Sequence, residues 1–351
     1  MKHKIYCSIP LLILVLMFSG NAFAGSKEIY YEKGLKAYLE ENYETASKEF
    51  LKAAEQGHAN AQYSLARLYF KGIGVPQNYT EAANWLHKAA GQGLPKAQAI
   101  LGTMYYEGIG VPQNYTEAAN WLRKAAEKGD ADAQTNLGVM YYEGIGVPQN
   151  YTEAANWLRK AAEKGDADAQ TKLGVMYYEG QGAPQNYEEA MKWYLKASAQ
   201  GDAMAQFNLG LIYLLGKGAI QNYSVAEKWF RKAAEQGYVQ AQYNLGLLYA
   251  NGDGVTQDYA EANKWWCKAA EQGDAEAQKN LGLMYYRGEG VPQNFSQAYI
   301  WFSIAVTNSV GELHEIVIDF RNQVAKQLSV QELNQAQETA GEWRNKPNTT
   351  N

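Results

Sequence analysis

The residues in this sequence that could do chemistry lack the spacing that the chemistry requires. His314 and Glu315 begin the HExxH pattern, in which two histidines four residues apart on one helix face bind zinc. The second histidine is absent, because Ile318 occupies its position. His58 and His87 stand where other copies of an internal repeat carry aspartate or arginine, so we expect them to be surface substitutions. With no cysteine cluster either, the sequence predicts no metal site.

Motifs for nucleophiles and for phosphate binding are also missing. The sequence contains neither GxSxG nor SxxK, one of which an activated serine of the usual hydrolase or penicillin-recognising type would need. The recurring Gly-x-Gly, as at Gly108 and Gly110, lacks a third glycine and follows a helical pattern, so it predicts a turn between helices. Cys267, the one cysteine beyond residue 24, is predicted to be a small buried hydrophobe. We therefore expect no catalytic residue and no cofactor.

Within the repeats, five asparagines lie in Asn-x-Ser/Thr segments that match the acceptor for N-linked glycans: Asn78, Asn114, Asn150, Asn222 and Asn294. Each also stands where a helix should begin, and a cap on that helix explains the residue sufficiently. Glycan attachment stays open as the alternative.

The first 24 residues have the three parts of an export signal. Lys2 and Lys4 are basic, residues 9–18 are apolar, and small residues end at Ala24. We expect cleavage after Ala24 and export to the periplasm or the medium, with no later segment that spans a membrane. Cys7 lies too early to carry a lipid at the cleavage point. Without the two leader lysines the chain has 30 basic and 37 acidic side chains, which argues against nucleic acid as a partner.

A segment of 36 residues is repeated along most of the chain. The 32 residues from Met104 to Thr135 recur without change from Met140 to Thr171. Two series of landmark residues keep the same step, namely Gln62, Gln98, Gln134, Gln170, Gln206, Gln242 and Gln278, and Trp85, Trp121, Trp157, Trp193, Trp229, Trp265 and Trp301. A fixed period of this size is typical of a solenoid.

Each repeat should form two antiparallel helices. Apolar residues within 61–69 fall on one side of a first helix, and the glycines and proline of 72–76 end it. Asn78 and Glu81 predict a capping box at the start of the second helix. A glycine recurs inside the first helices, as at Gly102, where it costs helix stability. We expect it to allow the close approach of a neighbouring helix.

These patterns predict an all-α chain in four parts. We assign residues 1–24 to a signal peptide, 25–59 to an N-terminal capping helix pair and 60–309 to seven repeats. Residues 310–351 should form C-terminal capping helices and a frayed tail.

The repeat pattern of residues 133–165, AQxxLGxxYxxGxGVPQNYxEAxxWxxKAAxxG, resembles the Sel-one-like repeat, a relative of the tetratricopeptide repeat. The resemblance implies a right-handed superhelical solenoid of antiparallel helix pairs that serves as an adaptor for protein–protein contact. Similar proteins of bacterial envelopes include scaffolds for polysaccharide export and secreted factors that engage host proteins. A cysteine-rich branch linked to penicillin binding carries a disulfide in each repeat, and this chain lacks those cysteines.

The side of the first helices opposite their apolar stripe is the predicted binding surface. We expect it to line a concave groove in which apolar residues supply contact area and amides bind a peptide backbone. In the alternative, the superhelix closes enough for these side chains to pack on each other. The candidate groove residues are Asn136, Val139, Lys172, Val175, Asn208, Leu211, Leu215, Asn244, Leu247, Asn280 and Leu283.

The sequence thus predicts an exported, non-catalytic scaffold that binds a partner protein or peptide, with a host-interacting, virulence-related factor as one form. The partner is not expected to be nucleic acid, a membrane or a metal. Two alternatives remain open: a periplasmic scaffold for envelope or polysaccharide assembly, and an enzyme that acts on the cell wall or on beta-lactams.

Overall fold

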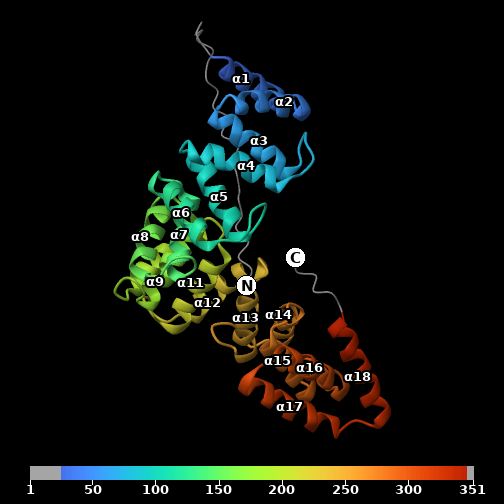
Figure 1. Ribbon diagram of the computed structural model, residues 1–351. Coiled ribbons are helices and arrows are strands. Elements are labelled where there is room, and N and C mark those ends of the chain that lie inside the picture. Colours follow the sequence, from blue (N-terminus) through green and yellow to red (C-terminus); the bar gives the residue numbers. More distant parts are fainter. Residues whose placement is uncertain (1–24, 346–351) are drawn as a thin grey trace. The chain divides into compact units, whose positions relative to one another are not determined.

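The computed structural model describes residues 25–345, and in this part of the chain eighteen helices and no strand are present (Figure 1). Residues 1–24, where the sequence predicts a signal peptide, and residues 346–351 of the expected tail lie outside the described residues. The helices are α1 (Ser26–Leu39), α2 (Tyr43–Glu55), α3 (Ala59–Lys71), α4 (Tyr79–Gly91), α5 (Pro95–Glu107), α6 (Tyr115–Glu127), α7 (Ala131–Glu143), α8 (Tyr151–Glu163), α9 (Ala167–Glu179), α10 (Tyr187–Ala199), α11 (Ala203–Leu215), α12 (Tyr223–Glu235), α13 (Val239–Asn251), α14 (Tyr259–Glu271), α15 (Ala275–Arg287), α16 (Phe295–Asn308), α17 (Gly311–Ala325) and α18 (Val330–Asn345).

The chain folds as two compact units. The N-terminal unit comprises residues 1–169 and 180–184, and the C-terminal unit comprises residues 170–179 and 185–351. Within each unit the helices pack in pairs, as α3 on α4 or α13 on α14, and each pair packs on the next through its second helix. Each unit is therefore a stack of helical hairpins, which is the all-α solenoid arrangement expected from the repeat.

Glycines build the turn inside each repeat. Gly108 follows the last residue of α5 with φ +73°, a left-handed conformation that favours glycine and ends the helix. Gly110 has φ +71°, and a β-carbon there would collide with the backbone carbonyl of Tyr79 in the preceding repeat. Both glycines of the Gly-x-Gly motif are therefore required. The first ends the helix, and the second allows the turn to pack against the preceding repeat.

The expected capping boxes are only half formed at the second helices. The Asn78 side chain accepts a hydrogen bond from the backbone N–H of Glu81 at 3.0 Å, as predicted. The reciprocal bond from the glutamate was predicted wrongly, because the backbone N–H of Asn78 donates to the carbonyl of Tyr69 at 2.9 Å. Ser329 and Glu332 form the complete box before α18, with bonds of 2.9 and 3.3 Å.

The glycines within the first helices face large side chains of the paired second helices. A β-carbon on Gly138 would lie 2.7 Å from Cγ of Leu158, and one on Gly210 would lie 2.5 Å from the Phe230 ring. Ordinary carbon contacts are about 3.5–4.0 Å. The prediction that these glycines permit close helix packing is confirmed.

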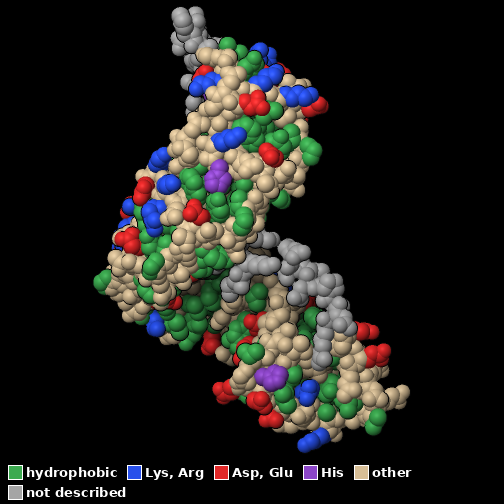
Figure 2. Space-filling view, viewed as in Figure 1, with side chains coloured by type: hydrophobic (Ala, Val, Ile, Leu, Met, Phe, Trp, Pro, Cys, Tyr) green, Lys and Arg blue, Asp and Glu red, His purple; other side chains and the backbone are tan. Residues whose placement is uncertain are grey.

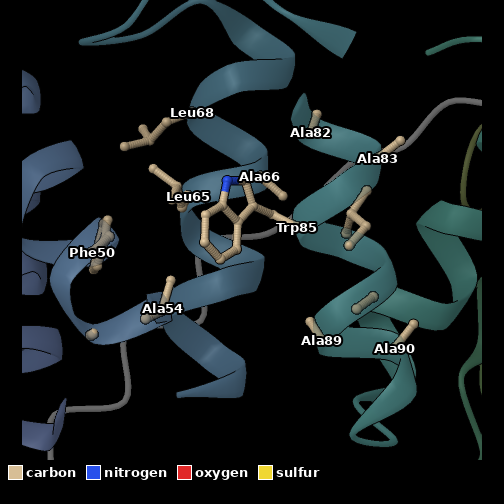
Figure 3. Close-up of a cluster of buried hydrophobic side chains, with 14 of the residues drawn as sticks. Phe50, Ala54, Leu65, Ala66, Leu68, Ala82, Ala83, Trp85, Ala89 and Ala90 are labelled. Carbon is tan, nitrogen blue, oxygen red and sulfur yellow. The ribbon is translucent and has the colours of Figure 1, made fainter. Parts of the chain in front are cut away.

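The recurring tryptophans sit between helices. In Figure 3 the indole of Trp85, on α4, is directed toward Leu65 and Ala66 of α3, and all three side chains are buried. A lysine one turn later covers the ring. The Lys88 ammonium lies 3.8 Å from the ring centroid of Trp85. A lysine lies over the ring in the same way at Trp121, Trp157, Trp193, Trp229 and Trp265, whereas Trp301 packs against the ring of Trp343.

The recurring glutamines tie neighbouring helices together. Gln242, in α13, is buried, and its Nε2 donates to the carbonyl of Ala234, at the end of α12, at 3.1 Å. Its Oε1 accepts from Nε2 of Gln272, after α14, at 2.9 Å. One buried amide therefore links three successive helices, and a buried amide is stable only with such partners. The donor bond recurs at Gln62, Gln98, Gln134 and Gln278.

The first helix departs from the other first helices at two positions of the core. Gly34 in α1 faces Phe50 in the way that Gly102 faces Leu122. Gly34 corresponds to Ala66 of α3. With this alignment, Lys33 and Lys36 occupy the positions of the buried Leu65 and Leu68 of α3. Both lysines are exposed, and so are the apolar Leu35 and Leu39 of the same helix.

Candidate binding face on the first helices

Four positions with a spacing of four, three and four residues form the solvent-facing side of each first helix in the C-terminal unit. On α11 they are Met204, Asn208, Leu211 and Leu215. The matching positions are 240, 244, 247 and 251 on α13, and 276, 280, 283 and 287 on α15. A spacing of this kind places the residues on one side of a helix, so the three helices present four parallel rows.

The apolar row is shared between packing and surface. Val175, Leu211, Leu247 and Leu283 are half-buried, and each packs against a core of the C-terminal unit. Their inner atoms therefore belong to the helix packing, and only the outer part is open to a partner. Leu215, one turn further along α11, is 50 % exposed.

The amide row consists of Asn208, Asn244 and Asn280, and its members differ in their hydrogen bonds. Asn244 donates from Nδ2 to the carbonyl of Gln240 at 2.7 Å, and Asn280 lies beside the side chain of Tyr243. Burial raises the pKa of Tyr243 to about 12, so its hydroxyl stays protonated. Asn208 has no such bond to any residue in the described part of the chain. Lys172 holds the matching position on α9 and is half-buried.

The remaining two candidates belong to the N-terminal unit. Asn136 and Val139 lie half-buried on α7. Near the start of this helix, burial raises the pKa of the Asp132 carboxyl, and repulsion from Asp130 and Asp166 adds to the rise. This end of the α7 face is therefore acidic and would favour a basic group on a partner.

Two of the three histidines in residues 25–345 have structural roles, so the prediction of surface substitutions was wrong for them. His58 is half-buried, stacks on Tyr31 with 4.3 Å between ring centroids, and accepts the backbone N–H of Ala61 on Nδ1 at 3.1 Å. His87 Nε2 lies 2.9 Å from the hydroxyl of Tyr105.

Sister repeats show why histidine suits both places. Asp130 caps Ala133 as His58 caps its own helix, and Arg123 donates to the hydroxyl of Tyr141 as His87 pairs with its tyrosine. The imidazole replaces either side chain because it offers an acceptor and a donor on one ring. The sequence column already contained this signal, but the tertiary partner was needed to interpret it.

Cys267 was expected to be buried, and the structure shows it half-buried. Its Sγ lies 3.5 Å from Oδ1 of Asn263, beside the core that includes Trp266. Burial raises the pKa of the thiol to about 11, which keeps the nucleophilic thiolate scarce at neutral pH.

Residues 25–345 contain no group of three or more His, Cys, Asp or Glu arranged to hold a metal. Within the same part of the chain no helix has both the length and the apolar character needed to cross a bilayer.

Two exposed apolar residues beside the predicted row were missed. Met204 is 41 % exposed on α11, and Ile220, in the turn after it, is 91 % exposed. The available signal was a departure from the repeat. At these positions the two identical repeats carry Asp132 and Pro148, neither of which is a large apolar side chain.

The comparison with protein families decides what kind of repeat this is. The model of the Sel1 repeat matches residues 21–58, 59–94, 95–130, 131–166, 167–202, 203–238, 239–274 and 275–309. The chain belongs to the Sel1 repeat family. The first matched segment covers most of the pair assigned above to an N-terminal cap, so the family counts eight repeats where the sequence division has seven.

Two solved structures are similar to this Sel1 repeat chain. A Sel1 repeat protein from Oxalobacter formigenes is 33 % identical, with a TM-score of 0.68, and the match covers 84 % of this chain and 87 % of that one. A protective antigen present in uropathogenic Escherichia coli strains is 30 % identical, with a TM-score of 0.44, over 91 % of this chain and 92 % of that one. A comparison with curated protein sequences gives no significant match. Sel1 repeat proteins generally serve as scaffolds for protein interactions.

Proposed function

We propose that this chain is an exported, non-catalytic scaffold that binds a partner protein or peptide on the solvent-facing side of its first helices. Family membership supports the general role of protein binding. The observation that carries the choice of surface is the row of half-buried apolar residues on α9, α11, α13 and α15, which lies beside a row of amides on the last three of these helices. Apolar area and amides together suit a partner's side chains and backbone.

Export is part of this proposal. It is supported by the leader pattern of residues 1–24. A host-directed factor should be released into the medium, whereas an envelope scaffold should stay in the periplasm. Fractionation of cells that express the full chain distinguishes these two forms of the proposal, and recovery of uncleaved chain in the cytoplasm would contradict both.

The binding role is tested by capture with the purified chain, followed by mass spectrometry of the retained proteins. The matched variant is Asn208→Asp with Leu215→Glu, which changes the half-buried amide and the exposed Leu215 and leaves Leu211, which packs against the core, in place. We expect wild type to retain a partner that the variant loses, with equal helicity by circular dichroism. No specific partner for wild type would contradict a scaffold role.

The non-catalytic part of the proposal has its own test. A purified chain that hydrolyses a chromogenic beta-lactam or releases soluble fragments from isolated cell wall, at a rate that rises with protein concentration, would show it to be an enzyme. We expect neither activity.

A further inference from the structure

Helix α11 differs from the other first helices on its solvent-facing side. Three of its four positions are apolar, namely Met204, Leu211 and Leu215. The matching positions of α7 carry Asp132, Val139 and Glu143, and those of α13 carry Gln240, Leu247 and Asn251. The sister helices fold in the same way with polar residues, so packing does not require Met204 or Leu215 to be apolar.

Apolar residues are exposed at both ends of the outer side of α11. Met204 and Leu215 are 41 % and 50 % exposed, and the nearby turn adds Ile220. Figure 2 shows hydrophobic side chains gathered on the visible face where α11 and α12 lie in Figure 1. Apolar side chains that are exposed along one side of a helix, and that the fold does not need, indicate a site of interaction.

The spacing on α11 is that of a helix-pairing seam. Positions 204, 208, 211 and 215 alternate by four, three and four residues, as d, a, d and a of a heptad do. At a rise of about 1.5 Å per residue the seam is about 16 Å long. The single polar member is Asn208 at an a position, where an asparagine in paired helices selects a polar partner and sets the register. Its amide has no bond to a described residue, in contrast to that of Asn244.

Charges at the two ends of the seam select an orientation. Asp202 caps the N-terminus of α11 and accepts from the hydroxyl of Thr171 at 3.0 Å. Lys217 follows the C-terminus, with its ammonium 5.9 Å from the ring centroids of Tyr178 and Tyr187. A helix has a partial positive charge at its N-terminus and a partial negative charge at its C-terminus. A partner helix is therefore stabilised when it runs parallel to α11, with its own N-terminus at Asp202 and its C-terminus at Lys217.

We propose that α11 is the main docking site and that its occupant is an amphipathic helix of the partner protein. This helix lies parallel to α11 and places one amide or hydroxyl side chain opposite Asn208, with apolar residues on either side. The proposal rests on the proposed function and adds the location, the partner's secondary structure and its direction.

A synthetic peptide tests it. The probe is a 21-residue helix with leucine at each d position, isoleucine at the outer a positions and asparagine at the central one, with lysine and glutamate elsewhere and fluorescein at one end. Anisotropy measures its binding to the full chain. The variant is Met204→Asp with Leu215→Glu, which installs the residues that the sister helix α7 carries. The control is Gln240→Asp with Asn251→Glu, the same change in charge one repeat away.

We expect wild type and the control to bind the probe alike and the α11 variant to bind at least tenfold more weakly. A benzophenone at the C-terminus of the probe should crosslink near Lys217, and one at the N-terminus near Asp202. Absence of binding, equal binding by the variant, or crosslinks in reversed order would overturn the proposal. A chain that is dimeric in solution and becomes monomeric in the α11 variant would also overturn it, because a second copy would then be the occupant.

The outcome is separable from that of the proposed function. If wild type captures a cellular partner and the α11 variant captures it equally, docking on α11 is wrong while the scaffold role stands. If wild type captures no partner, the scaffold role itself fails, whatever the peptide does.

Discussion

Substitution of Gly210 by alanine tests the packing that defines the repeat. The added β-carbon would lie 2.5 Å from Cδ1 and Cε1 of Phe230, about 1 Å short of an ordinary contact. Phe230 is fully buried and has no free space to move into. Overpacking of a core costs about 1–3 kcal/mol, and the better helix propensity of alanine returns about 1 kcal/mol. The difference is a net loss of up to about 2 kcal/mol, and we expect a value near the middle, about 1 kcal/mol.

The chain supplies its own scale for this prediction. At the same position α3 has Ala66, which is accommodated opposite the smaller Leu86. Gly138→Ala faces Leu158 and should therefore cost less than Gly210→Ala. Phe230→Leu should rescue Gly210→Ala, because the pair then matches that of α3.

Urea unfolding followed by circular dichroism measures these changes. Gly91→Ala is the control, since nothing lies within 4 Å of its β-carbon position and the helix should gain about 0.5–1 kcal/mol. If Gly210→Ala is as stable as wild type, or if Phe230→Leu does not rescue it, the reasoning about the recurring glycine is refuted. The effect of the double variant is compared with the sum of the two single effects, because the two residues touch and their effects on the free energy of unfolding are not additive.

Three further predictions concern buried polar groups. Gln242→Leu leaves the amide of Gln272 and a backbone carbonyl without their partner, and should cost about 1–3 kcal/mol, measured by the same urea titration; no loss would refute the linking role. Burial lowers the pKa of His58 below 6.5, so the unfolded chain binds more protons and stability should fall as pH drops from 7 to 5. His58→Asp, which installs the residue of the sister repeats, should reduce this loss. Melting temperatures of wild type and His58→Asp that depend equally on pH would contradict the prediction. Because its pKa is about 11, the thiol of Cys267 should react with iodoacetamide slowly at pH 7.5 and faster as pH rises toward 11, and rapid labelling at pH 7.5 would contradict the burial.

The features that depend on local pattern could be predicted from the sequence. The period, the helix pairs and the asparagine caps all follow from residues within one repeat. The role of the recurring glycine was also accessible, because a costly residue that recurs at a fixed step implies a close neighbour.

The features that depend on contacts with another helix could not be predicted. The glutamate half of the capping box fails because the Asn78 N–H is already bonded to Tyr69 across the turn. Leu211 looks like a free surface residue on a helical wheel, yet it packs against the core around Phe230. A wheel shows which residues leave their own helix, and it does not show which of them the adjacent helix covers.

The methionines of the chain allow a direct test of where the partner binds. Met204 is 41 % exposed, whereas Met104, Met140, Met176 and Met284 are at most 2 % exposed and serve as internal references. Dilute hydrogen peroxide converts an accessible methionine to its sulfoxide, which mass spectrometry quantifies residue by residue. With the captured partner bound, oxidation of Met204 should slow at least several-fold while the buried references stay unchanged. A rate at Met204 that is the same with and without the partner would contradict binding on α11.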